Sequence, residues 1–187
     1  MLKLKDYKKN FHHHDVPDAL GRLVELQNSL PGPFCQGFSL ALDDRSKLMP
    51  FSEKREFLDA LCPIGPANGS GALYVLWTRE AVKEVGDCPV LVFGDAGAVH
   101  IVAENVLQFL RVLTLDAEPM IDGESLIFMK DDGGPPSPGA PAYATWLETH
   151  FHLKPVKGVA EVELLVRSTQ SFLEKPLQSW LKHFKYE

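Results

Sequence analysis

Residues 67–115 constrain the fold more than any other part of the chain. They contain three short apolar runs, ALYVLWT, PVLVFG and AVHIVA, which are rich in the β-branched and aromatic residues that favour strands. Residues 95–97 (Asp-Ala-Gly) separate the second run from the third and predict a tight hairpin turn. A helix is expected after the third run, because Asn105 is a suitable N-cap and apolar residues recur behind it at helical spacing. A hairpin followed directly by a helix indicates an α+β fold.

The first of these runs, residues 72–78, is apolar on both faces. One face carries Leu73, Val75 and Trp77, and the other carries Ala72, Tyr74 and Leu76. A strand with two apolar faces is expected at the centre of a sheet that helices cover. Trp77 is therefore expected to be buried in the core.

Further helix and strand signals lie on either side of this segment. Apolar residues at helical spacing predict helical stretches over residues 18–29, 51–61, 143–152, 160–173 and 176–184. Alternating apolar residues predict a strand within residues 34–42, and a turn at Asp122-Gly123 accompanies a second short strand-like segment. The lysine-rich residues 1–10 are expected to form an exposed, loosely held arm.

A chain of 187 residues is long enough for one well-buried domain. We expect a core over residues 1–115 and a C-terminal extension over 116–187 that packs on the same domain. The Gly/Pro-rich residues 131–141 are expected to form a surface loop or linker within that extension. The fold class predicted is α+β, a mostly antiparallel sheet with helices packed on it.

Charge and cysteine content narrow the range of partners and compartments. The formal net charge of −6 argues against general nucleic-acid binding, which needs a basic face, and is compatible with a basic protein partner. The three cysteines, Cys35, Cys62 and Cys88, are odd in number and form no C-x-x-C pair, which predicts free thiols in a reducing compartment. No apolar run approaches the roughly 20 residues of a membrane span. The protein is therefore expected to be cytoplasmic, without a membrane partner.

The sequence contains no recognised catalytic, cofactor or metal motif. The run His12-His13-His14 is not followed by a further ligand at metal-site spacing, and His100, His150 and His152 also stand without partners at such spacing. The Asn68–Gly71 turn leads into a strand and lacks the G-K-[ST] of a phosphate loop. We therefore predict no catalytic residue, no cofactor and no metal, although residues distant in sequence could still converge into a site.

The order of features in residues 67–115 resembles the SUKH superfamily, which groups fungal cell-wall-synthesis regulators with many bacterial immunity proteins. The small-residue turn Asn68-Gly69-Ser70-Gly71 precedes a strand that ends in Leu76-Trp77, and Pro89-Val90 opens a strand that closes on Phe93-Gly94. The features that follow are Gly97 in the turn, Val99, Ile101, Val102 and Ala103 in the next strand, and Asn105, Val106, Phe109 and Leu110 in the helix.

This resemblance implies a non-enzymatic protein that binds and neutralises a toxin effector, possibly a nuclease with a basic cleft. Alternatives from the residues alone are a regulatory protein-interaction module without a toxin partner, or a hydrolase with an unrecognised site. Candidate contacts for a basic partner are the acids expected at the surface: Asp43, Asp44, Glu80, Glu84, Asp87, Asp131 and Asp132. The oligomeric state is not predicted.

Overall fold

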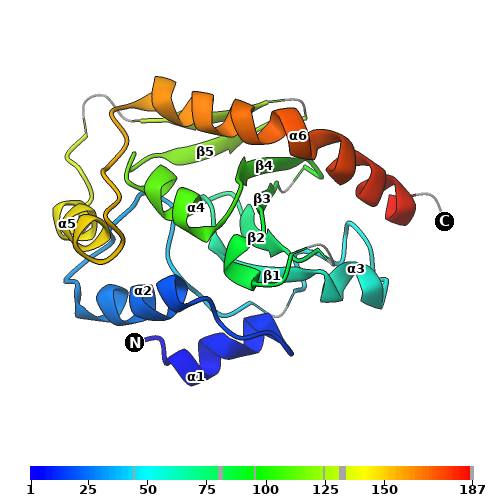
Figure 1. The fold of residues 1–187 in the computed structure, drawn as a ribbon, viewed down its shortest axis with the longest axis horizontal. Coiled ribbons are helices and arrows are strands. Elements are labelled where there is room, and N and C mark those ends of the chain that lie inside the picture. The colour runs from blue at the N-terminus through cyan, green and yellow to red at the C-terminus, as the bar shows by residue number, and fades with distance from the viewer. Residues whose placement is uncertain (44, 80–81, 95, 124, 131–133, 186–187) are drawn as a thin grey trace.

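The computed structural model describes residues 1–43, 45–79, 82–94, 96–123, 125–130 and 134–185. At its centre is a four-stranded antiparallel sheet in the order β1-β2-β3-β4, flanked by helices (Figure 1). The strands are β1 (Leu61–Pro66), β2 (Leu73–Trp77), β3 (Val90–Phe93) and β4 (Val99–Ala103). The predicted α+β class is confirmed.

Strand β2 lies inside the sheet between β1 and β3, and all five of its residues are buried. This burial agrees with the two apolar faces of its sequence. Leu73 pairs with Phe93 in the β2–β3 ladder, and the Trp77 side chain is buried with 3% of the residue exposed. The predicted central strand and the predicted burial of Trp77 are both confirmed.

Helices cover one face of the sheet through α2 (Asp18–Ser29) and α4 (Val106–Leu113). Leu20, Leu23 and Val24 of α2 belong to the same buried cluster as Tyr74 of β2. Asn105 begins α4 as predicted, because its side chain accepts a hydrogen bond from the backbone N–H of Gln108 at 2.8 Å.

The other face of the sheet is covered by α3 (Arg55–Asp59) and the C-terminal half of α6 (Val159–Lys185). The sequence predicted two helical stretches separated before Pro176, but α6 is one continuous helix with Pro176 inside it (Figure 1). Its burial explains the continuity: Val162 and Val166 join the cluster under α4, whereas Leu173, Leu177 and Leu181 join the cluster on the opposite face. Because both the part of α6 before Pro176 and the part after it pack into the core, the helix continues through Pro176 despite the destabilising effect of proline inside a helix.

A second, two-stranded sheet pairs β5 (Glu118–Ile121) with β6 (Leu126–Met129), and α5 (Ala140–Phe151) follows. The turn predicted at Asp122-Gly123 is present, since Asp122 accepts a hydrogen bond from the N–H of Ser125 at 2.7 Å. The described part of the predicted surface loop is anchored, because Ser137 is buried and donates through its backbone N–H and its Oγ to the Asp116 carboxylate.

The predicted exposed N-terminal arm is wrong. Residues 4–11 form the short helix α1 (Leu4–Tyr7) and the 3₁₀ helix η1 (Lys8–Phe11). Tyr7 and Phe11 are fully buried and their rings meet edge to face, with centroids 5.5 Å apart. The Tyr7 hydroxyl also donates to the carbonyl of Ile64 in β1, so two apolar side chains tie the lysine-rich segment to the sheet.

The strand predicted within residues 34–42 is also wrong, because side chains take the place of a neighbouring strand. The Gln27 amide bonds both backbone groups of Leu40, accepting at 2.7 Å and donating at 3.0 Å. The side-chain amide of Asn10 likewise donates a hydrogen bond to the backbone carbonyl of Ala41. Phe38 and Leu40 remain buried, as their alternation suggested, but the segment forms no ladder.

The predicted helix over 51–61 is shorter than expected. The Ser52 hydroxyl accepts the N–H of Lys54 in a turn, and the helix begins only at Arg55. Residues 61–66 form β1, a strand that the sequence did not predict, with Pro63 opposite Val75 of β2. A short 3₁₀ helix, η2 (Val85–Asp87), lies in the loop between β2 and β3.

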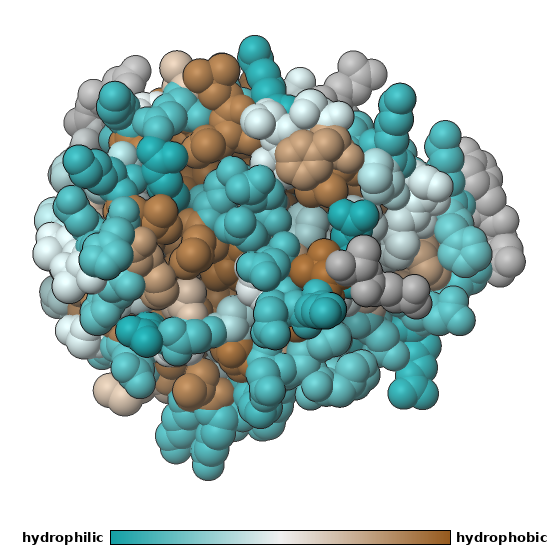
Figure 2. Space-filling view, in the orientation of Figure 1, coloured by the Kyte–Doolittle hydropathy of each residue, from teal (hydrophilic) through white to brown (hydrophobic). Residues whose placement is uncertain are grey.

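The surface of the molecule mixes hydrophilic and hydrophobic side chains. Leu164 and Phe172 of α6 are 68% and 54% exposed, and Figure 2 shows hydrophobic residues among hydrophilic ones in the region of this helix. Met120, Ile127 and Met129 are exposed on the β5–β6 hairpin. No helix in the described ranges has the length and apolar character needed to cross a membrane.

Candidate functional site

A hollow with mainly apolar walls lies at the end of the sheet where the β1–β2 and β3–β4 turns meet. Its volume is about 290 Å³. We call it the apolar hollow, and its lining residues are Lys47, Pro50, Phe51, Gly71, Leu73, Phe93, Gly94 and Gly97. This volume is at the lower end of the roughly 300–1,000 Å³ found for ligand pockets, which suits one large side chain.

Each of the two turns that border the apolar hollow contains a glycine with a positive φ angle. Gly71 and Gly97 have φ angles of +108° and +87°, and a Cβ at either position would meet no atom of the described residues within 4 Å. The first turn is fixed by the Asn68 side chain, whose Oδ1 accepts the N–H groups of Ser70 and Ala72. Both turns therefore combine backbone conformations that favour glycine with open space beside them.

The opposite wall of the apolar hollow is the turn segment 45–52. Its backbone is folded by successive hydrogen bonds, from the N–H of Leu48 to the carbonyl of Arg45 and from Phe51 to Leu48. Leu48 is fully buried and anchors the segment in the core. The Phe51 ring meets the Phe93 ring edge to face, with centroids 4.8 Å apart. These two rings give the hollow an aromatic wall.

A second, larger hollow of about 660 Å³ lies on the other side of Lys47. We call it the polar hollow; its lining residues are Lys9, Asn10, His12, Leu42, Asp43, Arg45, Ser46 and Lys47. Lys47 lines both hollows, so one ammonium group stands between an apolar site and a polar site. Leu42, which is 52% exposed, adds an apolar surface to the polar hollow.

Arg45 is the buried cation of the polar hollow. Its guanidinium lies 3.4 Å from the Asp59 carboxylate and donates to the carbonyl of Leu61 at 3.1 Å, while its Nε has no hydrogen-bond partner among the described residues. Burial lowers the pKa of Arg45, and the neighbouring Asp59 opposes this shift. The backbone of Arg45 has a φ of +67°, which places this buried residue in a conformation unusual for a side-chain-bearing residue.

The cations of the polar hollow differ in what surrounds them. Lys9 pairs with Asp6 at 3.1 Å, and Arg45 pairs with Asp59. Lys47 is exposed and forms no ion pair within the part of the chain that the structure describes. Within the described residues, Lys47 thus differs from Lys9 and Arg45, each of which has a carboxylate partner.

The predicted acidic contacts fall in separate places. Asp43 lines the polar hollow, where its Oδ1 accepts the N–H of Arg45 at 2.6 Å. Glu84 and Asp87 are exposed beside each other, at the start and the end of η2, away from both hollows. The other predicted contacts lie outside the described residues: Asp44, Glu80, Asp131 and Asp132.

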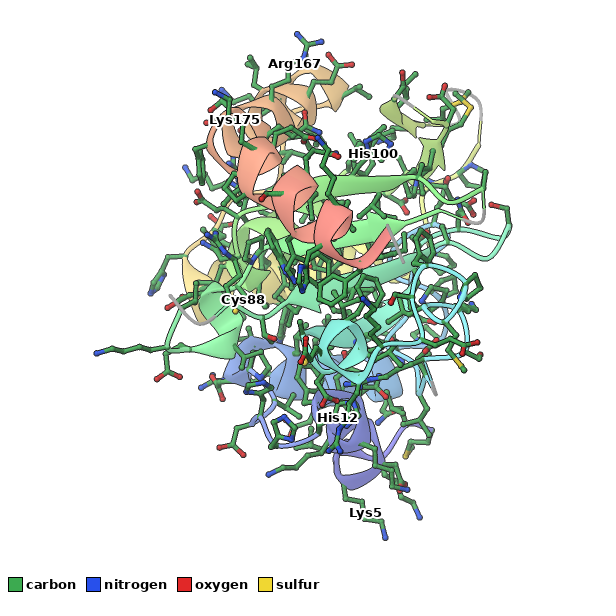
Figure 3. The ribbon with its side chains drawn as sticks, turned by 90° about the vertical axis from the view of Figure 1, so that its right-hand side faces the viewer. Lys5, His12, Cys88, His100, Arg167 and Lys175 are labelled. Atoms are coloured by element: carbon green, nitrogen blue, oxygen red, sulfur yellow. The ribbon has the colours of Figure 1, made fainter. Side chains whose placement is uncertain are left out.

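The histidines that could suggest a metal site lie in different parts of the molecule, apart from the adjacent rings of His12, His13 and His14. Figure 3 shows His12 near one end of the molecule and His100 towards the other, beside α6. The Nε2 atom of His100 lies 3.1 Å from the carbonyl oxygen of Asp122. Within the described ranges, no group of three or more His, Cys, Asp or Glu residues is placed to hold a metal ion.

All three cysteines are free and buried, as predicted from their spacing. Burial raises the pKa of Cys35 and Cys88, and raises the pKa of Cys62 to about 12. The thiols are therefore neutral at physiological pH and poor nucleophiles.

Neither hollow was predicted from the sequence. The signals present were the glycines of the two hairpin turns, which were assigned only to turn formation. The remaining wall comes from residues 45–52, which were assigned to no site. Comparison with family models, with curated proteins and with solved structures finds no match to this chain.

Proposed function

We propose that this protein is a non-enzymatic binding protein that docks a protein effector at the apolar hollow and blocks the effector's activity. One observation carries the proposal: aromatic and aliphatic side chains and glycine turns form the hollow, and Lys47 is the charged residue among the described residues that line it. Such a lining provides apolar contact area and a cation to orient a ligand, which are the elements of a binding pocket.

The surroundings of the hollow support a protein as the ligand. Met49 of the turn segment 45–52 is 45% exposed, and Leu42, which lines the polar hollow together with Lys47, is 52% exposed. An exposed apolar surface bordered by charge is typical of a protein contact site. The turn segment that bears it is fixed by Leu48 in the core, so the surface is preorganised for docking.

The toxin-neutralising role follows from the resemblance to SUKH proteins, and the cytoplasmic location follows from the cysteine content; both belong to this proposal. A rigid α+β scaffold that presents a preformed surface suits a protein that acts by covering another. Glu84 and Asp87, exposed at η2, are available for a second contact with a basic partner.

The proposal is tested by capture and rescue. The full chain is used as bait in lysate of the source organism, and the stoichiometric partner is identified by mass spectrometry. We then expect expression of that partner to arrest a bacterial host, and coexpression of the wild-type chain to restore growth.

Pro50→Asp, at the exposed rim of the hollow, should abolish capture and rescue. Pro141→Asp is the matched control, because Pro141 is exposed at the start of α5 and away from both hollows. Capture of a partner that is not toxic would point to a regulatory module and would contradict neutralisation. Absence of any stoichiometric partner would contradict the binding role itself.

A further inference from the structure

We propose that the docked segment of the partner carries an aromatic side chain that enters the apolar hollow and an adjacent carboxylate that pairs with Lys47. This inference rests on the proposed function and specifies the chemistry of the ligand. It follows from the position of Lys47, which lines both the apolar hollow and a second hollow that contains further charged and polar side chains.

The aromatic lining of the apolar hollow is the reason for proposing an aromatic side chain on the partner. Phe51 and Phe93 both line the hollow, and their ring planes stand at 86° to each other. A third ring placed there can pack against both in the edge-to-face geometry that aromatic side chains prefer. Leu73 forms part of the lining and is only 1% exposed, so it adds apolar contact.

The open space at the glycines lets the backbone of the partner approach. A Cβ at Gly71 or Gly97 would have no neighbour within 4 Å, so the two turns border the hollow without filling it. Gly94 is different, because a Cβ there would lie 2.9 Å from the Ile121 side chain of β5. The hollow is therefore closed behind Gly94 and open beside the other two glycines.

The charge of Lys47 is the reason for proposing a carboxylate on the partner. Among the cations that line the two hollows, Lys9 and Arg45 already pair with Asp6 and Asp59, and Lys47 has no such carboxylate among the described residues. Asp43 faces the polar hollow but accepts the N–H of Arg45. A carboxylate next to the aromatic side chain would meet Lys47 at the boundary, whereas a basic residue there would be repelled by Lys47.

The inference is tested with three short peptides titrated into the ¹⁵N-labelled full chain and followed by NMR. The probes are acetyl-Gly-Phe-Asp-Gly-amide, its Phe-Asn counterpart and its Ala-Asp counterpart. We expect the Phe-Asp peptide to shift the amide signals of Gly71, Gly94 and Gly97. We expect it to bind about two- to five-fold more tightly than the Phe-Asn peptide, the range that one exposed ion pair supports. The Ala-Asp peptide should leave these signals in place.

Lys47→Glu should remove the preference for Asp over Asn, and Lys175→Glu, an exposed charge reversal on α6, should keep it. Equal binding of the Asp and Asn peptides to the wild-type chain would overturn the ion pair, and shifts confined to other residues would overturn the site. Either result, together with a partner captured through Pro50, would leave the proposed function standing and remove only this inference. If the Phe-Asp peptide binds but no partner is captured, the result would contradict the proposed function and show only that the hollow binds a segment of this chemistry.

Discussion

The Trp180 ring of α6 stacks on the Phe57 ring of α3, with the ring centroids 5.0 Å apart and the planes 17° from parallel. The ring of Trp77 in the central strand also contacts Trp180, with the two ring centroids 5.2 Å apart. The stack joins a five-residue helix and the C-terminal helix to the same face of the sheet. Aromatic pairs of this kind add to the stability gained from burial alone.

Trp180→Ala should therefore destabilise the fold by about 2–4 kcal/mol, somewhat less than a fully buried tryptophan because Trp180 is half-buried. Urea denaturation followed by far-UV circular dichroism measures the change. Phe172→Ala is the control on the same helix: its ring is 54% exposed, and its loss should change stability by less than about 0.5 kcal/mol. Equal effects of the two substitutions would show that the aromatic stack contributes nothing of its own.

Asp116 connects three segments through a buried carboxylate. It accepts hydrogen bonds from the N–H of Gln36, the N–H of Ser137 and the Ser137 hydroxyl, at 2.9, 2.7 and 2.6 Å. Its φ of +56° is tolerated by Asp and Asn better than by Ala. Asp116→Ala should lower the free energy of unfolding by about 2–4 kcal/mol, since it leaves three donors without their acceptor and adds backbone strain.

Ser137→Ala removes only the hydroxyl and should lower the free energy of unfolding by about 1 kcal/mol, measured by the same urea denaturation. A larger loss for Ser137→Ala than for Asp116→Ala would contradict the central role of the carboxylate.

The buried thiols predict a loss of stability in alkali. Unfolded cysteines ionise near pH 8.5, whereas burial keeps the folded thiols protonated, with the pKa of Cys62 raised to about 12. Above pH 8.5 the unfolded chain therefore holds fewer protons than the folded chain, and the free energy of unfolding falls as the pH rises. Each thiol contributes a slope of up to about 1.4 kcal/mol per pH unit.

Cys62→Ala should reduce the slope of the unfolding free energy against pH by the contribution of one thiol, up to about 1.4 kcal/mol per pH unit. Urea denaturation of both proteins at pH 7.5, 8.5 and 9.5 measures it, and because both proteins contain the same buried tyrosines, the difference between their slopes belongs to Cys62. An unchanged slope would mean that Cys62 ionises as readily in the folded chain as in the unfolded one.

Gly65 of β1 marks a close approach of two backbones. A Cβ at this position would lie 2.0 Å from the carbonyl oxygen of Ser39, which is part of a fixed backbone segment. Gly65→Ala should therefore destabilise the protein by about 1–3 kcal/mol or more, as overpacking does. Gly69→Ala in the following turn meets open space and should change the melting temperature little. A stable Gly65→Ala protein would show that the two segments can separate without cost.

The segment 67–115 could be predicted because its signals are local. Alternation within β2, the glycine turn before β4 and the Asn105 cap each depend on neighbours in sequence, and each is present in the structure. The same applies to α2, whose bounds match the prediction.

The errors arose where distant side chains decide the structure. Residues 34–42 have the alternation of a strand, but the Gln27 side chain bonds the backbone where a strand would pair. The composition of residues 1–10 is that of an exposed arm, yet burial of Tyr7 against β1 outweighs the lysines. The apolar hollow has the same origin, because Phe51 and Phe93 come together only once the turn segment packs over the sheet.

The position of Ser39 beside Gly65 also determines how copies of this protein can meet. β1 is the outermost strand on its side of the sheet, and the edge of such a strand can accept a strand from another molecule. Here residues 39–41 occupy that edge, and the N–H of Ala41 reaches the carbonyl of Ile64 at 3.5 Å. The chain thus shields its own sheet from edge-to-edge aggregation through β1, and a partner must be recognised by side chains and turns, not by an added strand there.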